Sequence, residues 1–297
     1  LNSTLSCNEI SLTLSPQFWV EFDADILIFP LYKDSLSLGY LASASICSQA
    51  PNGRPIAGAI FVNAARTAST GGGFAQAVRA VEHEILHLLL LTPEAFLASP
   101  GTKLAATTSG SGSLVFVSPA VIAHGRNQMN CAEFAGLLAE DGGSVSSRGS
   151  HFDKSLAGDE LMTAALPAKP LVTRYTMGLF GDSSWFSADF SFAGRSGWGR
   201  AAGCGFLKRC GGGSPPFCEV EGVDGCSADR LAKARCVVSS LAGGCGIFEP
   251  GPGDSSDCRR LRPADSPLEE RGPVSRCVTA KGADNGVLAL CLRMRCE

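Results

Sequence analysis

Short apolar runs separated by turn-forming residues occur within the first ninety positions of the chain, a pattern that predicts β-strands. The runs cover residues 24–29, 39–42 and 57–62. Asn52-Gly53 lies between the second and third runs and is typical of a tight turn. A further apolar run at residues 114–117 predicts another strand inside the otherwise loop-rich stretch from residue 95 to residue 150.

The pattern changes after these strands. From Phe74 to Leu91 the residues favour a helix and include no glycine or proline, and Pro93 supplies a stop signal. Apolar side chains lie on nearly every side of this predicted helix, so we expect it to be buried. A second helix is predicted at about residues 170–180.

Composition and charge narrow the class of protein. The chain has 297 residues, of which 45% are hydrophobic and 18% charged, so it is long enough and apolar enough to fold around a sizeable core. Its formal net charge is -3 and it has no run dense in lysine and arginine, which argues against nucleic acid or an anionic lipid surface as the main partner. No apolar stretch reaches the roughly 18 residues of a membrane-spanning helix, so we expect the chain as given to be soluble.

The thirteen cysteines are unevenly placed, with three before residue 200 and ten from Cys204 to Cys296. Such density predicts a disulfide-stapled region and an oxidising compartment, hence a secreted protein or one at a cell surface. The C-terminal cluster has no C-x-x-C spacing, which argues against a zinc ribbon. Because thirteen is odd, at least one cysteine has no partner within the chain.

The chemistry is concentrated in the predicted helix, which contains His83-Glu84-Ile85-Leu86-His87. Two histidines four residues apart lie on one helical face, where they can bind one zinc ion. Glu84 lies beside His83 and is the expected general base. The alternative is a core helix that buries these polar residues for another reason, which is costly in a helix rich in leucine.

A catalytic zinc usually has three protein ligands, so a third ligand is needed. A glutamate twenty residues further on, as in thermolysin-like enzymes, is missing, because Glu94 is too close to the motif. The contiguous metzincin motif is also missing, since Leu90 and Pro93 stand where it has glycine and histidine. His124 and His151 remain as candidates, and His151 precedes Met162 by eleven residues, as expected for a methionine turn beneath the metal.

At this point the sequence resembles the leishmanolysin family, the surface zinc proteases of trypanosomatid protozoa, which are similar to metzincins but carry a long insertion before the third histidine. The resemblance covers nearly the whole chain. It rests on the H-E-x-x-H helix together with the motifs Asp23-Ala24-Asp25-Ile26, Gly53-Arg54-Pro55-Ile56-Ala57-Gly58, Gly149-Ser150-His151, Asp159-Glu160-Leu161-Met162, Ala188-Asp189-Phe190-Ser191, Trp198-Gly199 and Gly203-Cys204.

The resemblance implies an α+β fold of the metzincin type. Residues 1–92 would form an N-terminal catalytic subdomain with a mixed twisted sheet and the active-site helix. Residues 93–209 would form a mainly helical and loop-built central subdomain, and residues 210–297 a cysteine-rich domain of mostly irregular and β structure. The chain would lack the start of the first part and the end of the last part.

The same resemblance implies the roles of individual residues. His83, His87 and His151 would bind one Zn²⁺, Glu84 would be the base, and Met162 would be the methionine of the turn, which leaves His124 as an ordinary loop histidine. Six disulfides are implied, and Cys296 would pair outside the chain. The implied pairs are Cys7–Cys47, Cys131–Cys204, Cys210–Cys245, Cys218–Cys236, Cys226–Cys277 and Cys258–Cys291.

We therefore predict a zinc-dependent endopeptidase in which Glu84 activates a zinc-bound water for attack on a peptide bond. An extended protein or peptide substrate would pair with an edge strand at Ala59, Ile60, Phe61 and Val62. Ala164 and Ala165, after the methionine turn, would shape the pocket beyond the scissile bond.

The expected location is the cell surface or the extracellular space, with any membrane attachment through a lipid anchor absent from this chain. Host or extracellular-matrix proteins are further candidate partners, and Asn2 begins a glycosylation sequon. The second hypothesis is a catalytically weak surface adhesion protein that keeps the metzincin fold. It is motivated by the large cysteine-rich region and by Leu90, because the glycine of relatives permits a sharp helix end that leucine resists.

Overall fold

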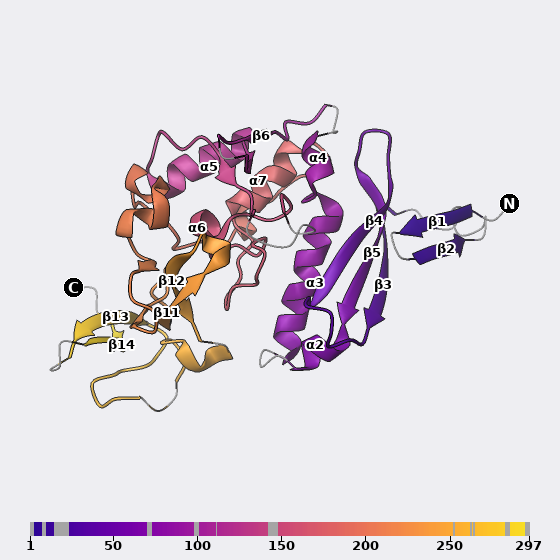
Figure 1. The fold of residues 1–297 in the computed structure, drawn as a ribbon. Coiled ribbons are helices and arrows are strands. Elements are labelled where there is room, and N and C mark those ends of the chain that lie inside the picture. The colour runs from indigo at the N-terminus through magenta and orange to yellow at the C-terminus, as the bar shows by residue number, and fades with distance from the viewer. Residues whose placement is uncertain are drawn as a thin grey trace. The chain divides into compact units, whose positions relative to one another are not determined.

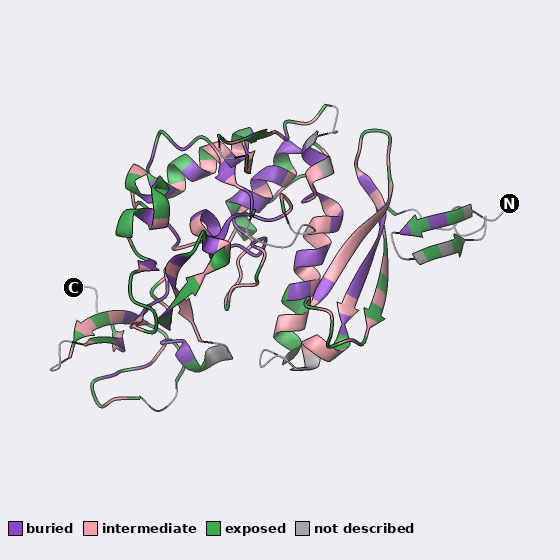
Figure 2. Ribbon diagram, in the orientation of Figure 1, coloured by how far each residue is buried: buried purple, intermediate pink, exposed green. Residues whose placement is uncertain are grey.

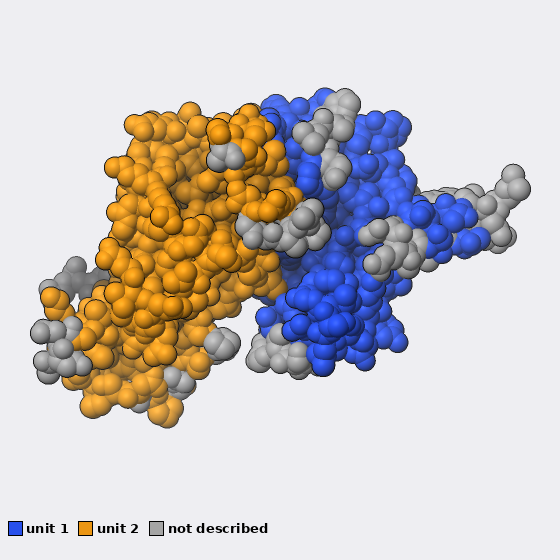
Figure 3. All heavy atoms as spheres, viewed as in Figure 1, with its two compact units in different colours: residues 1–106, 179–187 blue, residues 107–178, 188–297 orange. Residues whose placement is uncertain are grey.

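The computed structural model describes residues 3–7, 10–14, 24–69, 73–97, 101–110, 112–141, 148–251, 253–261, 263, 265–282 and 286–294. The chain forms two compact units, coloured separately in Figure 3. The first contains residues 1–106 and 179–187, and the second contains residues 107–178 and 188–297.

A three-stranded sheet and a long helix form the centre of the first unit (Figure 1). The strand order is β3-β5-β4, with β3 parallel and β4 antiparallel to the central strand. The elements of this unit are β1 (Ser3–Cys7), β2 (Ile10–Leu14), β3 (Leu27–Lys33), β4 (Ala42–Gln49), β5 (Pro55–Asn63), α2 (Ala64–Ser69), α3 (Gly73–Leu89) and α4 (Pro93–Leu97). The predicted turn at Asn52-Gly53 connects β4 to β5, and Gly53 has the positive φ that such a turn requires.

The two faces of the central strand pack on different partners. Ala57, Ala59 and Phe61 form a buried cluster with Leu5 and Cys7 on one face. On the other face, a β-carbon added at Gly58 would lie only 2.4 Å from a Leu88 methyl group. The absence of a side chain at Gly58 therefore lets α3 pack closely against the sheet beside the histidine motif.

The predicted long helix is confirmed as α3, but the expectation that it is buried throughout is wrong. Its first half is open to solvent, with Phe74 86% exposed, whereas Leu88 at the other end is buried. Figure 2 shows this gradient along the helix. Burial is set by the residues that pack on the helix, and a pattern of apolar residues alone does not specify them.

The second unit begins with a small sheet and short helices. Its three-stranded sheet has the order β6-β7-β8, and the predicted strand at residues 114–117 is confirmed as β7. The elements up to residue 207 are β6 (Ala106–Thr108), β7 (Leu114–Phe116), α5 (Pro119–Met129), β8 (Leu137–Leu138), α6 (Lys154–Ala157), α7 (Arg174–Asp182), η1 (Phe190–Phe192) and η2 (Cys204–Leu207). Of these, Ala106 and the last turn of α7, from Leu179 onward, belong to the first unit. The predicted second helix is α7, which begins only after Thr173, whose hydroxyl accepts a hydrogen bond from the Tyr175 amide.

The cysteine-rich region consists of short strands joined by disulfides. It contains a four-stranded sheet with the order β10-β11-β12-β9 and the pair β13-β14. Its elements are η3 (Arg209–Gly213), β9 (Phe217–Cys218), β10 (Asp224–Cys226), β11 (Lys233–Ser239), η4 (Ser240–Ala242), β12 (Cys245–Pro250), η5 (Gly253–Ser256), β13 (Ser275–Lys281) and β14 (Val287–Arg293). Four half-cystines and Ala289 form a buried cluster, so disulfide sulfurs replace the apolar side chains of an ordinary core.

The structure contains the six disulfide pairs that the resemblance implies. They join Cys7–Cys47, Cys131–Cys204, Cys210–Cys245, Cys218–Cys236, Cys226–Cys277 and Cys258–Cys291. Cys296 and the sequon residue Asn2 lie outside the described residues.

These features confirm a disulfide-rich α+β fold of the metzincin-like class. The three-part domain division stays a prediction, because two units defined by compactness do not test whether residues 210–297 fold separately. Of the helices in the described part of the chain, none is both long and apolar enough to cross a lipid bilayer.

Candidate metal centre

Helix α3 presents His83 and His87 one turn apart on the same face, as the spacing predicts. Their Nε2 atoms are 3.0 Å apart, and the two rings meet edge to face with centroids 4.6 Å apart. His83 is buried, while His87 is half-buried. The two ring nitrogens closest to each other are therefore the pair that a shared cation would use.

The end of α3 orients the second histidine. The helix ends at Leu89, and Leu90 does not adopt a left-handed conformation. The amides of Leu90 and Leu91 both donate to the Leu86 carbonyl at 3.0 Å, so the chain turns away while burying both leucines. The Leu91 carbonyl then lies 2.7 Å from His87 Nδ1. Because a carbonyl only accepts, Nδ1 carries the proton and Nε2 keeps its lone pair for a metal.

The helix therefore stops without the glycine that the family resemblance implies at position 90. The sequence suggested that leucine there would resist a sharp helix end, and this expectation is wrong, because α3 ends at Leu89. Leu90 and Leu91 are fully buried, so burial of apolar surface sets the turn that glycine would otherwise permit.

His151 lies in a short extended segment with backbone partners on both sides. The Glu140 amide donates to the His151 carbonyl at 2.9 Å, and the next residue, Phe152, donates its amide to the Met162 carbonyl at 2.8 Å. Met162 is fully buried. Asp153 then caps α6 through the Ser155 amide, so the chain around His151 is fixed by strand-like pairing on both sides and by a helix start.

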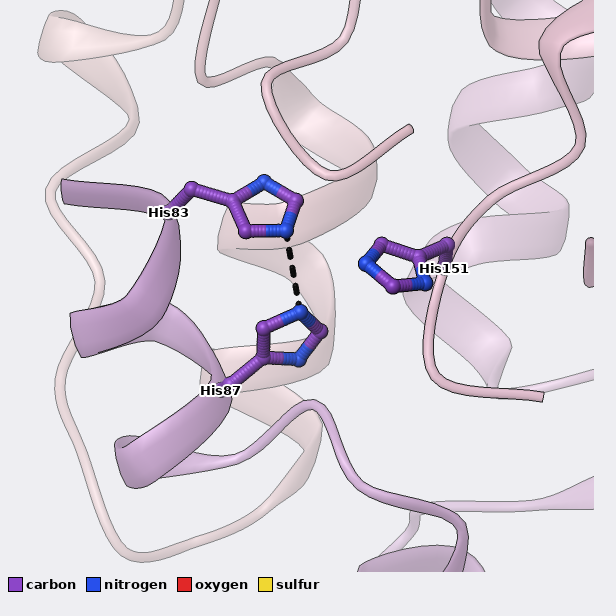
Figure 4. A group of neighbouring side chains, drawn as sticks. All are labelled: His83, His87 and His151. Carbon is purple, nitrogen blue, oxygen red and sulfur yellow. Dashed lines mark hydrogen bonds between the residues drawn. The ribbon is translucent and has the colours of Figure 1, made fainter. Parts of the chain in front are cut away.

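His83, His87 and His151 come together. Their candidate ligand nitrogens all lie within 4.8 Å of one another, and Figure 4 shows the three rings turned toward one another. Three nitrogens at zinc-binding distance in a tetrahedral site would be about 3.3 Å apart, so modest side-chain adjustment suffices. Three neutral imidazoles and one open position are the donor set of a catalytic zinc site, and the residues present fit that ion.

His124 is not part of this group. It lies in helix α5 and not in the loop expected from the sequence, and it packs edge to face on Tyr175 with ring centroids 4.5 Å apart. Burial, together with the nearby Arg174, lowers the pKa of His124 to about 4. The structure therefore gives His124 a packing role.

Glu84 is buried beside His83, with 8% of its surface exposed. Burial raises the pKa of Glu84 to about 7, and a hydrogen bond from the Ala44 backbone opposes this rise. A carboxyl group with a pKa near neutrality can both take up and release a proton under ordinary conditions. Ala44 lies on β4, so the same contact places this carboxyl group beside a strand backbone.

The predicted substrate strand at Ala59, Ile60, Phe61 and Val62 is wrong. These residues belong to β5, which is the central strand, and each of them has a partner on both β3 and β4. A strand with two neighbours has no free edge for a peptide. Within the described residues β4 has a ladder partner on one side only, so Ala42–Gln49 is the edge strand that contacts α3. Local apolar runs do not reveal the order of strands in a sheet.

Ala164 and Ala165 follow the methionine turn as predicted. Ala164 is half-buried and Ala165 is exposed, and the Ala165 carbonyl accepts a hydrogen bond from the Thr163 hydroxyl. Their role in shaping a substrate pocket stays a prediction.

Sequence reasoning missed what the acidic pair before the methionine turn does. Glu160 is fully buried, and its carboxylate accepts hydrogen bonds from Thr173 and Thr176. Asp159 accepts a hydrogen bond from Ser196 at 3.0 Å. The available sequence signal was the pair of adjacent acids directly before the apolar Leu161-Met162 of the predicted methionine turn.

The chain is similar to known proteases. A family model described as leishmanolysin, of peptidase family M8, matches residues 14–243. The leishmanolysin of Leishmania chagasi is 31% identical over 87% of this chain and 49% of its own length, and that of Leishmania tropica is 35% identical over 67% of this chain and 31% of its own length. A human protein named ciliated left-right organizer metallopeptidase is 28% identical over 81% of this chain and 33% of its own length. The chain thus spans about half the length, or less, of these relatives.

Proposed function

Because the chain belongs to the leishmanolysin family, we propose that it carries the catalytic centre of a zinc-dependent endopeptidase that cleaves extended polypeptides. The observation that carries the proposal is the group of three histidines with a buried glutamate next to the first of them. Family membership supports a metallopeptidase in general. The metal, the base and the substrate strand are our own assignments.

His83, His87 and His151 would hold the ion through ring nitrogens. When bound, Zn²⁺ supplies Lewis acidity, which polarises a peptide carbonyl and makes water more acidic. The hydrogen bond from His87 Nδ1 to the Leu91 carbonyl supports this assignment, because such outer partners fix the ring tautomer that binds metal.

Glu84 would hold and transfer the proton. Its carboxylate accepts a proton as the nucleophile forms and returns it to the leaving amine, so no covalent bond to the protein is formed. A pKa raised to about 7 by burial matches that double role. The Ala44 backbone keeps the carboxyl group in place at the sheet edge.

The substrate would pair with β4, in place of the central strand suggested by the sequence. Extended peptides add to exposed strand edges through backbone hydrogen bonds. The contact between Glu84 and Ala44 supports β4, because it places the proposed base next to the edge where a scissile bond would lie. This assignment makes the protease one that acts on exposed, extended segments of proteins or peptides.

We also propose a location at the cell surface or outside the cell, where disulfides form and persist. Six disulfides within one chain support an oxidising compartment. Leu90 and the large cysteine-rich region were the two sequence reasons for a catalytically weak adhesion protein, and the end of α3 at Leu89 weakens the first of them.

The experiment compares the unmutated chain with Glu84→Gln and with the control Glu82→Gln on the same helix. Glu82 pairs with Arg79 at the surface and does not belong to the site. Zinc content is measured by atomic absorption, and cleavage by release of fluorescence from a quenched peptide library, with and without chelator. We expect stoichiometric zinc in all three proteins and a 10²- to 10⁴-fold loss of cleavage in Glu84→Gln alone.

The outcomes separate the hypotheses. Cleavage that survives Glu84→Gln would contradict the assigned base, and cleavage that survives chelation would contradict the metal. Bound zinc without any cleavage by the unmutated chain would support the adhesion hypothesis.

A further inference from the structure

A fully buried carboxylate lies directly before the methionine turn. Glu160 is 1% exposed, and both of its oxygens accept hydrogen bonds. Oε1 accepts from the Leu161 amide at 3.1 Å and from the Thr176 hydroxyl at 3.0 Å, and Oε2 accepts from the Thr173 amide at 2.9 Å and from the Thr173 hydroxyl. Four donors thus converge on one side chain from its own turn and from the start of α7.

The donor set requires a carboxyl group. Each oxygen faces one backbone N–H, and a backbone N–H can only donate. An amide in the same place would therefore point its NH₂ group at a backbone donor in either orientation. Burial without such partners would be costly for an acid, so the surrounding groups explain why this acid can be buried here.

Glu160 fixes the chain that leads to Met162. The Leu161 amide also donates to the Leu171 carbonyl at 2.7 Å, and the Leu171 amide donates to the Asp159 carbonyl at 2.9 Å. These backbone bonds run beside the carboxylate contacts, so the segment at residues 159–161 is tied to residues 171–176 by both side chain and backbone.

The methionine turn, which Glu160 holds, is bonded directly to the residue that follows His151. The Met162 carbonyl accepts the amide hydrogen of Phe152, the residue after His151, at 2.8 Å. Phe152 also forms a β-bridge with Thr163 on this side and with Ala139 on the other. Movement of the methionine turn would therefore displace the backbone of the proposed third ligand directly.

We propose that Glu160 is a positioning residue, which fixes His151 through the Leu161–Met162 turn and the bond from Phe152 to Met162. The inference rests on the proposed function for its consequence, since the positioned group is a proposed metal ligand. Its first consequence, a protected Phe152 amide, does not depend on any metal.

The first test measures amide hydrogen exchange by NMR in the metal-free full chain. Variants are Glu160→Gln, Thr176→Val, and the exposed control Glu219→Gln. The reference amide is that of Cys236, which donates to Val223 at 2.8 Å in the cysteine-rich region. We expect the exchange of Phe152 relative to Cys236 to rise at least tenfold in Glu160→Gln and about threefold in Thr176→Val, with no change in the control.

General loss of stability would speed exchange at both amides, so the ratio isolates the local effect. Thr176→Val removes one donor and leaves the carboxyl group in place, which keeps the test valid if Glu160→Gln does not fold. An unchanged ratio in the folded variants would overturn the inference.

The second test measures the metal site. Zinc affinity is determined by chelator competition, and the visible absorption of the Co²⁺-loaded protein reports ligand geometry. We expect at least fivefold weaker zinc binding and an altered Co²⁺ spectrum in Glu160→Gln. Unchanged affinity and spectrum alongside faster Phe152 exchange would overturn the link to the site. If the unmutated chain bound neither ion, the proposed function would fail, and the exchange ratio would still decide whether Glu160 holds the turn.

Discussion

At the scale of single residues, Leu90 shows how one position can be filled in two ways. The family resemblance implies a glycine at the end of the active-site helix, whereas this chain has two buried leucines there and a hydrogen bond from His87 to the Leu91 carbonyl. The leucine has become part of the core, so its removal would leave a cavity. Replacing Leu90 by the glycine that the resemblance implies should therefore destabilise this protein.

We predict that Leu90→Gly lowers the free energy of unfolding by about 3 kcal/mol, through lost burial and added backbone freedom. Zinc affinity should fall as well, because the Leu91 carbonyl loses its fixed position next to His87. Urea denaturation and chelator competition measure the two effects, and Leu90→Met, which keeps the volume, serves as the control. A glycine variant as stable as the original, with faster cleavage, would refute this account of the helix end.

Glu160 leads to a prediction about pH. Burial raises its pKa from 4.5 to about 7, against the four donors that favour its charged form. Because the pKa of Glu160 is higher in the folded protein than in the unfolded chain, protonation of Glu160 stabilises the fold. This contribution to the free energy of unfolding is fully present below about pH 4.5 and is lost as pH rises through about 7. The titratable neighbour is Tyr175, whose pKa burial also raises, so it stays neutral across this range.

We therefore compare the free energy of unfolding of the unmutated protein with that of Glu160→Gln. The difference, unmutated protein minus variant, should fall by about 3 kcal/mol between pH 4.5 and pH 8. The difference between the two proteins is needed because burial also raises the pKa values of Glu84 and Asp159. Urea denaturation in chelator-containing buffer at a series of pH values measures it. A difference that stays constant would show that the four hydrogen bonds keep Glu160 charged throughout.

At the scale of elements, the contact between α3 and β5 determines where the histidine motif lies. Gly58 has no side chain, and Leu88 occupies that space directly after His87. An alanine β-carbon there would also lie 3.1 Å from the Ser45 carbonyl, so the helix must shift to make room. Gly58→Ala should cost about 1–3 kcal/mol in stability and weaken zinc binding severalfold.

Gly39→Ala is the matched control, because a β-carbon at Gly39 meets nothing within 4 Å. That change should alter stability by less than about 0.5 kcal/mol and leave zinc affinity unchanged. Thermal unfolding and chelator competition are measured for both variants. Equal behaviour of the two would mean that the close approach of α3 to β5 is not needed for the site.

The element scale also shows where sequence reasoning succeeds. Helix α3 and the spacing of His83 and His87 follow from local periodicity, which needs no knowledge of the rest of the chain. The position of β5 in the centre of its sheet does not, because strand order depends on pairing between distant segments. The residues alone left His124 and His151 open, because long-range contacts bring His151 to the other two histidines and pack His124 on Tyr175.

At the scale of the whole molecule, two kinds of core hold one chain. The sheet and α3 bury ordinary apolar residues, whereas the cysteine-rich region gathers Cys226, Cys258, Cys277 and Cys291 around Ala289. The pairing could not be derived from spacing, because six disulfides allow thousands of connectivities and the resemblance alone selected one. The stability of the cysteine-rich region should consequently depend on its disulfide bonds more than on the burial of apolar side chains.

Replacing both Cys258 and Cys291 by alanine tests this dependence. Their bridge joins residues 33 positions apart, and a loop of that length corresponds to about 4 kcal/mol in the chain-entropy model. We predict new proteolytic cleavage within residues 253–294, detected by mass spectrometry. The ladder around His151 runs through residues 138–140 and 162–163, so zinc affinity should change less than threefold. A parallel loss of zinc binding would instead mean that the cysteine-rich region holds the third ligand in place, and the site could then no longer be treated as independent of that core.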